Sequence, residues 1–486
     1  MKKLLLLLIV LITFVGVTVC FANDATSNQN VIQCKSVEEV TTKLTAAKPG
    51  DIIELKNGNY ALGTLNITCN GTADKPITFR AQTVGGVIFN DAAKLMINGK
   101  YVIIDGFTLN GDGGYIEFQK DSSYSSLFNT TMDKCGNDTW VAIWGTHIRV
   151  AYCAFKNKTG SKAKNKEMFR LRVGVEHYAQ VDHNYFYNYQ FLKEHPYDPI
   201  LNGTECIQVG MYLEKRPNGD IPWKNVPSHS VIEYNYFNKW YGETEFVSVK
   251  ASDTIIRYNT IEDCYGTVTL RQADDCQVNG NFFLQQGNPL AGGVRVYGAR
   301  HKIYNNYFAI AGESSIRTGV SIQNGKSDPG LDPQPARDTL VAFNTFVDCK
   351  NQSITFGGSG HPVSPAGCII ANNIFKSNNG VVIRNDRSTP SNTKYEGNIL
   401  FGAELGIPNP GGFKTVDPKL VLSNELYRIP KKSPARHGAV GSYDFINVDI
   451  SGLPRVGRKK DVGAEQFMTK KVLKPLTAND VGPRAR

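Results

Sequence analysis

After its first 22 residues, the 486-residue chain has no apolar run long enough to cross a lipid bilayer. The opening stretch, MKKLLLLLIVLITFVGVTVCFA, combines two lysines, a short apolar run and a small residue at a plausible cleavage site, which is typical of a secretory signal peptide. No basic cluster follows it, so a permanent membrane anchor is the weaker interpretation. We therefore expect residues 1–22 to be removed and the mature protein to be secreted, or periplasmic in a bacterium.

The chain also lacks any Cys-x-x-Cys pair, which argues against a zinc site. Without Cys20, nine cysteines remain: Cys34, Cys69, Cys135, Cys153, Cys206, Cys264, Cys276, Cys349 and Cys368. An oxidising compartment permits disulfides, so we expect some to form, although an odd number leaves one thiol unpaired and the pairing stays open. Seven Asn-x-Ser/Thr sequons make the chain a candidate glycoprotein: Asn66, Asn70, Asn129, Asn137, Asn157, Asn202 and Asn351.

The chain has no excess of acidic residues. Its formal net charge is +10, and removal of Lys2 and Lys3 with the signal peptide lowers this by two. A basic secreted protein suits an anionic partner, such as an acidic glycan, a nucleic acid or a membrane surface. Charge alone does not choose among these partners.

Leucine-rich spacing and 3.6-residue periodicity are both absent, which excludes leucine-rich and helical repeats. Asparagine recurs instead, within short β-branched and aromatic runs such as VDHNYFYN and IEYNYFNK. The repeated residues are Asn184, Asn235, Asn259, Asn281, Asn306, Asn344, Asn373 and Asn398, mostly 22 to 29 residues apart, with longer steps of 51 and 38. This period predicts an all-β fold, a right-handed parallel β-helix in which the asparagines stack from coil to coil.

We expect the β-helix to occupy residues 23–410. An amphipathic pattern from Val37 to Ala47 predicts a short helix, and because a solenoid needs its open end covered, this helix would be the N-terminal cap. The asparagine pattern ends near residue 410. Residues 411–486 are rich in Pro, Lys and Arg, and we predict a C-terminal extension packed on the outside of the last coils.

The stretch YGETEFVSVKASD carries two glutamates, Glu243 and Glu245, at alternate positions where their charges would repel. Alignment of GTECIQVG with GETEFVSVK places Glu205 over Glu245 and Asn202 beside Glu243. Oxygen atoms from two adjacent coils can share one hard cation, which takes six to eight oxygen ligands. We therefore predict a calcium site formed by Asn202, Glu243 and Glu245; solvated surface glutamates are the alternative.

Three cations precede the repeated asparagines by similar distances. Lys250, Arg271 and Arg295 lie nine, ten and eleven residues before Asn259, Asn281 and Asn306. If one-residue loop differences are allowed, they stack on successive coils about 4.8 Å apart. Strict strand alternation puts Lys250 on the face opposite the glutamates, so the prediction requires a bend between Val247 and Lys250.

This arrangement suits β-elimination from a uronic acid polymer. Calcium and an arginine on the sugar carboxylate would stabilise the charge that develops when the C5 proton is removed. Lys250 would be the general base, with its pKa lowered by the neighbouring cations. Loss of the C4 oxygen then cleaves the chain and leaves an unsaturated sugar.

The segments NGTECIQVG, GETEFVSVK, TVTLRQADD, GGVRVYGARHKIYNNYF and DVGAEQF resemble polysaccharide lyase family six, the alginate lyase and chondroitinase B family, from about residue 32 to the C-terminus. The resemblance implies a parallel β-helix, a calcium ion, Lys250 as base and Arg271 as acid. It also implies that Arg295, Tyr297 and Arg317 line the substrate groove. The partner would be an anionic uronate polysaccharide, and neither nucleic acid nor, after signal cleavage, a membrane.

The chain departs from the family pattern at three positions. Gln272 stands where histidine is common, and Gln208 where arginine is common, so substrate binding or preference could differ. Asn202 lies in the sequon NGT. A glycan there would be incompatible with calcium ligation, and we predict that this sequon is unused.

Two alternatives to a lyase remain open from sequence. A non-catalytic, adhesin-like β-helix could bind acidic glycans through the same cations. A polygalacturonase-like hydrolase is weaker, because it needs clustered aspartates and only the adjacent Asp274 and Asp275 are present. Among substrates we place alginate first and dermatan or chondroitin sulfate next. The sequence decides neither endo or exo action nor the oligomeric state.

Overall fold

The computed structural model describes residues 30–484, apart from residues 112, 137–138, 159–166, 173–175, 190–202, 212–226, 329–331, 379, 456–458 and 468–473. The predicted signal peptide, residues 1–22, lies outside the described residues. Among those described, no helix has the length and apolar character needed to cross a membrane.

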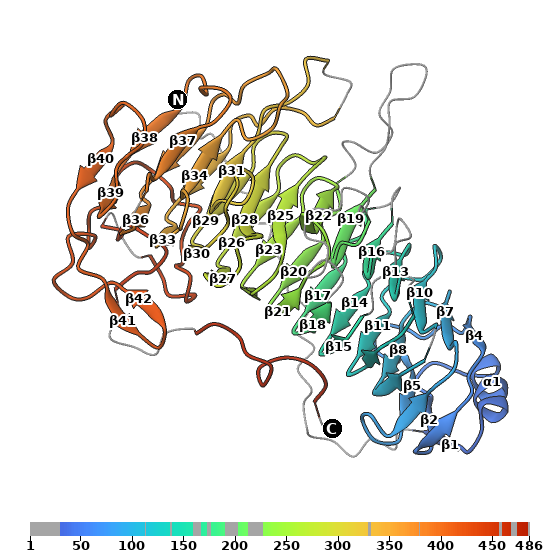
Figure 1. Cartoon of the computed structure of the whole chain (residues 1–486). Helices are drawn as coiled ribbons and strands as arrows, with labels where there is room; N and C mark the ends of the chain where they lie inside the picture. The colour runs from blue at the N-terminus through green and yellow to red at the C-terminus, as the bar shows by residue number, and fades with distance from the viewer. Residues whose placement is uncertain are drawn as a thin grey trace, which may run out of the picture.

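Three long parallel sheets form the walls of one solenoid (Figure 1). Sheet 1 contains β1 (Val31–Cys34), β2 (Ile52–Leu55), β5 (Ile77–Ala81), β8 (Val102–Asp105), β11 (Ser126–Phe128), β14 (Arg149–Ala151), β17 (Gln180–Asp182), β20 (Val231–Glu233), β23 (Ile255–Arg257), β26 (Gln277–Asn279), β29 (Lys302–Tyr304), β32 (Leu340–Ala342), β35 (Ile369–Ala371) and β38 (Lys394–Glu396). Sheet 2, which carries the predicted site, contains β4 (Thr64–Ile67), β7 (Lys94–Ile97), β10 (Tyr115–Phe118), β13 (Val141–Ile143), β16 (Phe169–Leu171), β19 (Ile207–Gly210), β22 (Glu245–Lys250), β25 (Gly266–Leu270), β28 (Ala291–Val296), β31 (Val320–Ile322), β34 (Ile354–Phe356) and β37 (Ile383–Asn385).

Sheet 3 completes each coil. It contains β3 (Gly58–Tyr60), β6 (Val87–Phe89), β9 (Phe107–Leu109), β12 (Thr131–Asp133), β15 (Ala154–Lys156), β18 (Tyr185–Tyr189), β21 (Tyr236–Trp240), β24 (Thr260–Glu262), β27 (Phe282–Gln285), β30 (Tyr307–Ile310), β33 (Thr345–Val347), β36 (Ile374–Lys376), β39 (Asn398–Phe401) and β40 (Phe413–Thr415). The chain visits sheets 2, 1 and 3 in turn, as in β13, β14 and β15, and then begins the next coil. The predicted right-handed parallel β-helix is confirmed.

Strand pairing places like residues above one another inside the solenoid. Val150, Val181, Ile232 and Ile256 are successive partners in sheet 1, and all four belong to one buried core cluster. Each coil therefore buries its β-branched residues against those of the coils on either side. This explains why the strands read as short Val, Ile and Phe runs.

The predicted asparagine stack is present at the corner between sheets 1 and 3. The Oδ1 atom of Asn281 accepts hydrogen bonds from the backbone N–H and the Nδ2 of Asn259, each at 3.0 Å. Asn281 makes the same pair of bonds to Oδ1 of Asn306 in the next coil. The residue before each asparagine has a positive φ, as at Tyr258 and Gly280, which turns the chain sharply enough to bring the amides together.

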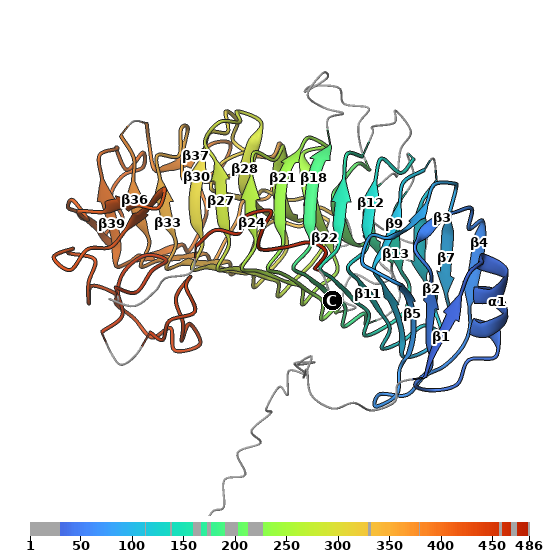
Figure 2. The same cartoon turned by 90° about the horizontal axis from the view of Figure 1, so that it is seen from below.

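The predicted N-terminal cap is confirmed as helix α1 (Val37–Thr45). The hydroxyl of Ser36 accepts a hydrogen bond from the backbone N–H of Glu39 at 3.3 Å and begins the helix. Val40 and Leu44 are buried in the core cluster, so α1 covers the first coil (Figure 2). The helix ends two residues before the predicted Ala47.

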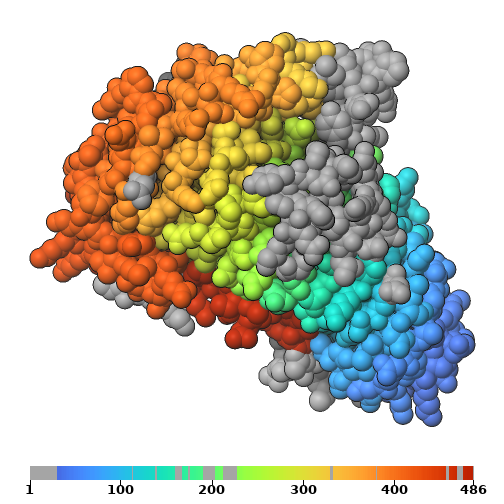
Figure 3. All heavy atoms as spheres, viewed as in Figure 1, coloured from blue at the N-terminus to red at the C-terminus, as the bar shows by residue number. Residues whose placement is uncertain are grey.

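Sheet 3 continues beyond the predicted boundary at residue 410, because β40 pairs with β39. An antiparallel hairpin follows, formed by β41 (Val421–Ser423) and β42 (Leu426–Arg428). The chain then packs on the side of the solenoid, where buried Arg455 donates a 2.9 Å hydrogen bond to Oδ1 of Asn305. Residues 474–484 run back along the coils, with the N–H of Gly482 donating to the carbonyl oxygen of His183 at 2.8 Å (Figure 3).

No disulfide forms among the nine cysteines that remain after Cys20, all of which lie in the described residues. Eight of them are buried, and Cys69 is partly buried. Burial raises the pKa of the Cys153 thiol, which packs inside the coils as a small apolar side chain. The expected disulfides are therefore absent from this structure.

Loss of one ladder asparagine should weaken the whole solenoid. Asn281→Ala removes the acceptor of two amide groups in a fully buried site, and each unsatisfied buried group costs about 1–3 kcal/mol. We expect a clear fall in the urea midpoint, with the protein still able to fold. The exposed Asn59→Ala is the control, and equal midpoints for the two variants would contradict a stabilising ladder.

Candidate active site

Strand β22 contains an irregularity that decides where its side chains point. Its pairing with β25 shifts between Glu245 and Val247, and both Phe246 and Val247 lie in the buried core. With two consecutive residues facing inwards, Glu245 and Lys250 face outwards on the same side, where Ser248 Oγ donates to Glu245 Oε2 at 2.6 Å. The prediction of a bend between Val247 and Lys250 is wrong about its position. The change of face occurs earlier, at a β-bulge at Phe246.

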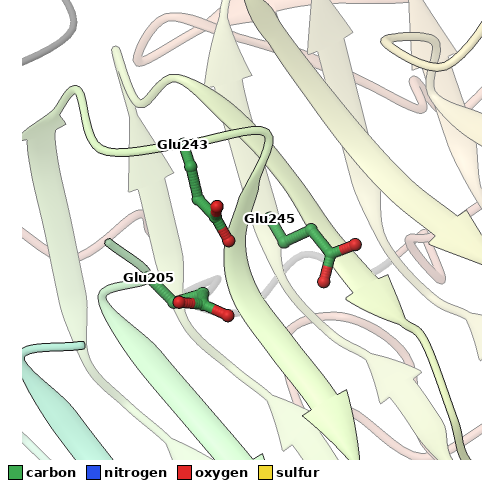
Figure 4. Close-up of side chains that lie close together, drawn as sticks. All are labelled: Glu205, Glu243 and Glu245. Atoms are coloured by element: carbon green, nitrogen blue, oxygen red, sulfur yellow. The ribbon is translucent and has the colours of Figure 1, made fainter. Parts of the chain in front are cut away.

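Three carboxylates converge outside sheet 2. One oxygen each of Glu205, Glu243 and Glu245 lies within 4.8 Å of the others (Figure 4). Glu243 belongs to the turn before β22, and the register of β19 with β22 places Glu205 in line with Glu245. The Oε2 atom of Glu205 is buried and has no hydrogen-bond partner among the described residues. An all-oxygen donor set with an unpartnered buried oxygen fits a hard cation such as Ca²⁺.

The structure adds one carboxylate to the predicted ligand set. Glu205, which the sequence alignment places over Glu245, joins Glu243 and Glu245 in the cluster. Asn202 lies outside the described residues. Its neighbour Gly203 donates a backbone hydrogen bond to Glu243 Oε2 at 3.1 Å, so this turn does approach the cluster.

Glu243 and Glu245 have opposite electrostatic surroundings. Burial, together with the charges of Glu205 and Glu245, raises the pKa of Glu243 well above its usual value. Burial would also raise the pKa of Glu245, but Arg295, Arg271 and Lys250 lower it to about 2. The site therefore holds one firmly ionised carboxylate and one that resists ionisation until another positive charge arrives.

Lys250 lies directly against this cluster. Its Nζ donates to Glu205 Oε1 at 3.1 Å, and both side chains are almost fully buried. Burial tends to lower the pKa of Lys250, but Glu205, Glu245 and Glu243 outweigh it and the pKa is raised. The lowered pKa predicted from the sequence assumes a calcium ion beside the amine, whereas the protein's own carboxylates, Glu205 first, raise the pKa.

Lys250, Arg271 and Arg295 were predicted to stack on successive coils, and this prediction is confirmed for Lys250 and Arg271 only. Val249 pairs with Leu270, so Lys250 and Arg271 are neighbours on adjacent coils. Arg295 pairs with Thr269 instead of Arg271 and therefore lies two residues out of line. Tyr297 occupies the position in line with Arg271. Arg295 keeps the same outward face because a two-residue shift preserves strand alternation.

The two arginines join the cluster through Glu245. Arg295 forms a close ion pair with Glu245 Oε1, and Arg271 Nε lies 3.4 Å from the same oxygen. Their guanidinium carbons lie 5.1 Å (Arg271) and 5.6 Å (Arg295) from the ring centre of Tyr297. The structure therefore brings Lys250, Arg271, Arg295, Tyr297 and the glutamates together.

Arg317 reaches the same region through an aromatic neighbour. Its Nη2 donates to the hydroxyl of Tyr265 at 2.7 Å. That hydroxyl lies 3.4 Å from Oγ1 of Thr244, the residue between Glu243 and Glu245. Arg317 thus stands beside the site but makes no ion pair with its carboxylates among the described residues.

Both glutamines that depart from the family pattern are engaged by carboxylates of the protein. Gln208 Nε2 donates to Glu205 Oε1 at 3.0 Å and to Glu167 Oε1 at 3.1 Å. Gln272 is buried and donates to Asp332. Gln208 therefore holds the carboxylate that contacts Lys250, while Gln272 fixes a neighbouring loop.

Comparison with known proteins agrees with this geometry. The sequence model described as chondroitinase B matches residues 34–358, two thirds of the chain. The chain belongs to the chondroitinase B family. This family is polysaccharide lyase family six, as the resemblance implied. No curated protein matches the sequence.

Solved structures of family-six lyases share the fold of this chondroitinase B family member. A mutant of the alginate lyase AlyGC superposes with a TM-score of 0.72 and 23% identity over 93% of this chain, which spans only 58% of AlyGC. An alginate lyase complexed with a trisaccharide superposes with a TM-score of 0.68 and 20% identity. The match covers 91% of this chain and 95% of that lyase. The lyase Pedsa3628 from Pseudopedobacter saltans superposes with a TM-score of 0.61 and 20% identity. The match covers 93% of this chain and 99% of Pedsa3628.

The carboxylate cluster should bind a divalent cation. We expect calorimetry to detect one Ca²⁺ site in the wild-type protein and Glu243→Gln to weaken it about 100-fold or more, since even outer-sphere partners contribute 10–100-fold. Glu313→Gln, which removes an exposed carboxylate from another part of the chain, should leave the affinity unchanged. An unaltered affinity in Glu243→Gln would rule out this cluster.

Calcium affinity should rise with pH. The pKa of Glu243 is raised, so below that pKa the side chain is protonated and an incoming cation must displace the proton. Above the usual glutamate range near 4.5, affinity should keep increasing until Glu243 ionises in the free protein, and binding should release a proton in that range. Calorimetry in buffers of different ionisation enthalpy measures this release; a pH-independent affinity above 4.5 would contradict the raised pKa.

Proposed function

We propose that the protein is a secreted lyase that cleaves a uronic-acid-containing anionic polysaccharide by β-elimination. Alginate is the first candidate substrate, and dermatan or chondroitin sulfate the next. The observation that carries the proposal is the position of Lys250 against a carboxylate cluster, with Arg271 on the adjacent coil. Membership of the chondroitinase B family supports the reaction class.

The residues divide the reaction between them. Lys250, with its amine neutral, would take the C5 proton of a uronate as general base. Arg271 would stabilise or protonate the C4 oxygen as it leaves. The C5–H and C4–O bonds break, a C4=C5 double bond forms, and the polymer is cleaved without water. Glu205, Glu243 and Glu245, with Asn202 as a predicted fourth ligand, would hold calcium, which when bound neutralises the sugar carboxylate.

Lys250 can act as a base only when its amine is neutral, so its pKa is decisive for the reaction. The glutamates that raise its pKa are also the proposed cation ligands. When their charge is offset, the cause of the raised pKa is removed and only burial, which lowers the pKa of a lysine, remains. We therefore expect the lysine to act as a base only in the cation-loaded protein.

The arginines near the cluster support an acidic polymer as the substrate. Arg271, Arg295 and Arg317 gather on one side of the cluster and suit carboxylates. Among the solved relatives are alginate lyases and a mannuronic-acid-specific lyase from the human gut microbiota. A non-catalytic adhesin would bind the polymer through the same cations, so turnover is what distinguishes it from a lyase.

Removal of the base should abolish turnover. We expect the wild-type protein with Ca²⁺ to generate ultraviolet-absorbing unsaturated product from at least one of alginate, dermatan sulfate and pectate. Lys250→Ala should lower kcat by about 10²–10⁴ with substrate binding retained. Lys394→Ala, an exposed lysine on sheet 1, is the control. Binding by the wild type with no absorbing product would favour the adhesin, and reducing ends without absorbance would favour a hydrolase.

A further inference from the structure

The outward-facing row that contains Lys250 continues toward the N-terminal coils of sheet 2. Strand register places one residue of each coil in this row, which we call the lysine row. In coil order it reads Gln119, Trp144, Arg172, Gly210, Lys250, Arg271 and Tyr297. Trp144 and Arg172 take no part in the chemistry proposed above.

At Gly210, between Arg172 and Lys250, the lysine row has no side chain. Its φ is +77°, and a Cβ there would lie 2.6 Å from the carbonyl oxygen of Lys250. A side chain at position 210 would therefore have to move the backbone of the proposed base. A polymer bound at Lys250 and extending along the row would next meet the side chains of Arg172 and Trp144.

Trp144 forms a compact patch with two cations. It directly follows β13, and its backbone N–H donates to the carbonyl oxygen of Phe118 at 2.8 Å, so its position is fixed by the sheet. The guanidinium carbon of Arg172 lies 5.2 Å from the indole centre, and Lys120 Nζ lies 5.8 Å from it. Among the described residues neither cation forms an ion pair, and the buried Nε of Arg172 has no hydrogen-bond partner.

These groups match the chemistry of a uronate residue. The C–H face of a sugar ring packs on an indole, and a carboxylate pairs with guanidinium and ammonium groups. Trp144 and Lys250 are three coils apart in the row, or about 14 Å. That separation is too long for one sugar to touch both. We infer that Trp144, Lys120 and Arg172 form a distal site for a further uronate of the same polymer chain, an inference that rests on the proposed function for the identity of the ligand.

Kinetics on substrates of different length test this distal site. Trp144→Ala and Arg172→Gln should each raise KM for the polymer about tenfold, equivalent to 1.4 kcal/mol, with kcat changed less than about twofold. KM for the shortest oligosaccharide that the wild type cleaves should stay the same. Phe445→Ala is the matched control, because its exposed ring also lies under a cation, Lys302 at 5.0 Å, away from the lysine row.

An unchanged KM for the polymer, or an equal rise for short and long substrates, would overturn the distal site. If the wild type cleaves no uronate polymer, the proposed function fails separately. Calorimetry with alginate then decides the site: a tenfold weaker affinity in Trp144→Ala supports it, and equal affinities for Trp144→Ala and the wild type overturn it.

Discussion

The register between coils is the constraint on which the site depends. Each ladder asparagine accepts hydrogen bonds from the asparagine one coil earlier, in a buried corner where no water can replace them. The bonds fix how far each coil is displaced along the solenoid. Glu205, Lys250 and Arg271 come from three successive coils, so their contacts exist only if that register holds. A slip by one residue would turn each of them to the other face.

Charge balance is the second constraint, and it explains the residues around Lys250. Three carboxylates held close together repel one another, and this repulsion contributes to the raised pKa of Glu243. Arg295 and Arg271 offset Glu245, while Glu205 forms an ion pair with Lys250, accepts a hydrogen bond from neutral Gln208 and interacts electrostatically with Arg170. Gln208 pairs in register with Arg170, so an arginine in its place would stand beside another guanidinium. A neutral amide can instead bridge Glu167 and Glu205.

Asparagine spacing was enough to predict the solenoid. The amphipathic pattern of residues 37–47 predicted its cap, and the alignment of GTECIQVG with GETEFVSVK brought the glutamates together. The sequence could not show the bulge at Phe246, because Phe246 and Val247 are both apolar and suit the core equally well. The error at Arg295 came from allowing loops to vary by one residue per coil. Tyr297, which the structure puts in line, lies nine residues before Asn306, as Lys250 does before Asn259, but Arg271 lies ten residues before Asn281. Counting back from the asparagines therefore cannot by itself decide which residue of each coil is in line.

The side chains of the site lie in two outward-facing rows on sheet 2. The first row contains Arg170, Gln208, Ser248, Thr269 and Arg295. Four of these, Arg170, Gln208, Ser248 and Arg295, contact Glu167, Glu205 or Glu245. The lysine row lies two residues further along each strand, roughly 7 Å away. Because Lys250 contacts Glu205 and Arg271 lies against Glu245, the two rows share these carboxylates, and substitutions in the first row can change the charge around Lys250. Substitutions at the far end of the second can alter how the polymer is held without touching the base, so one β-helix face can tune rate and binding independently.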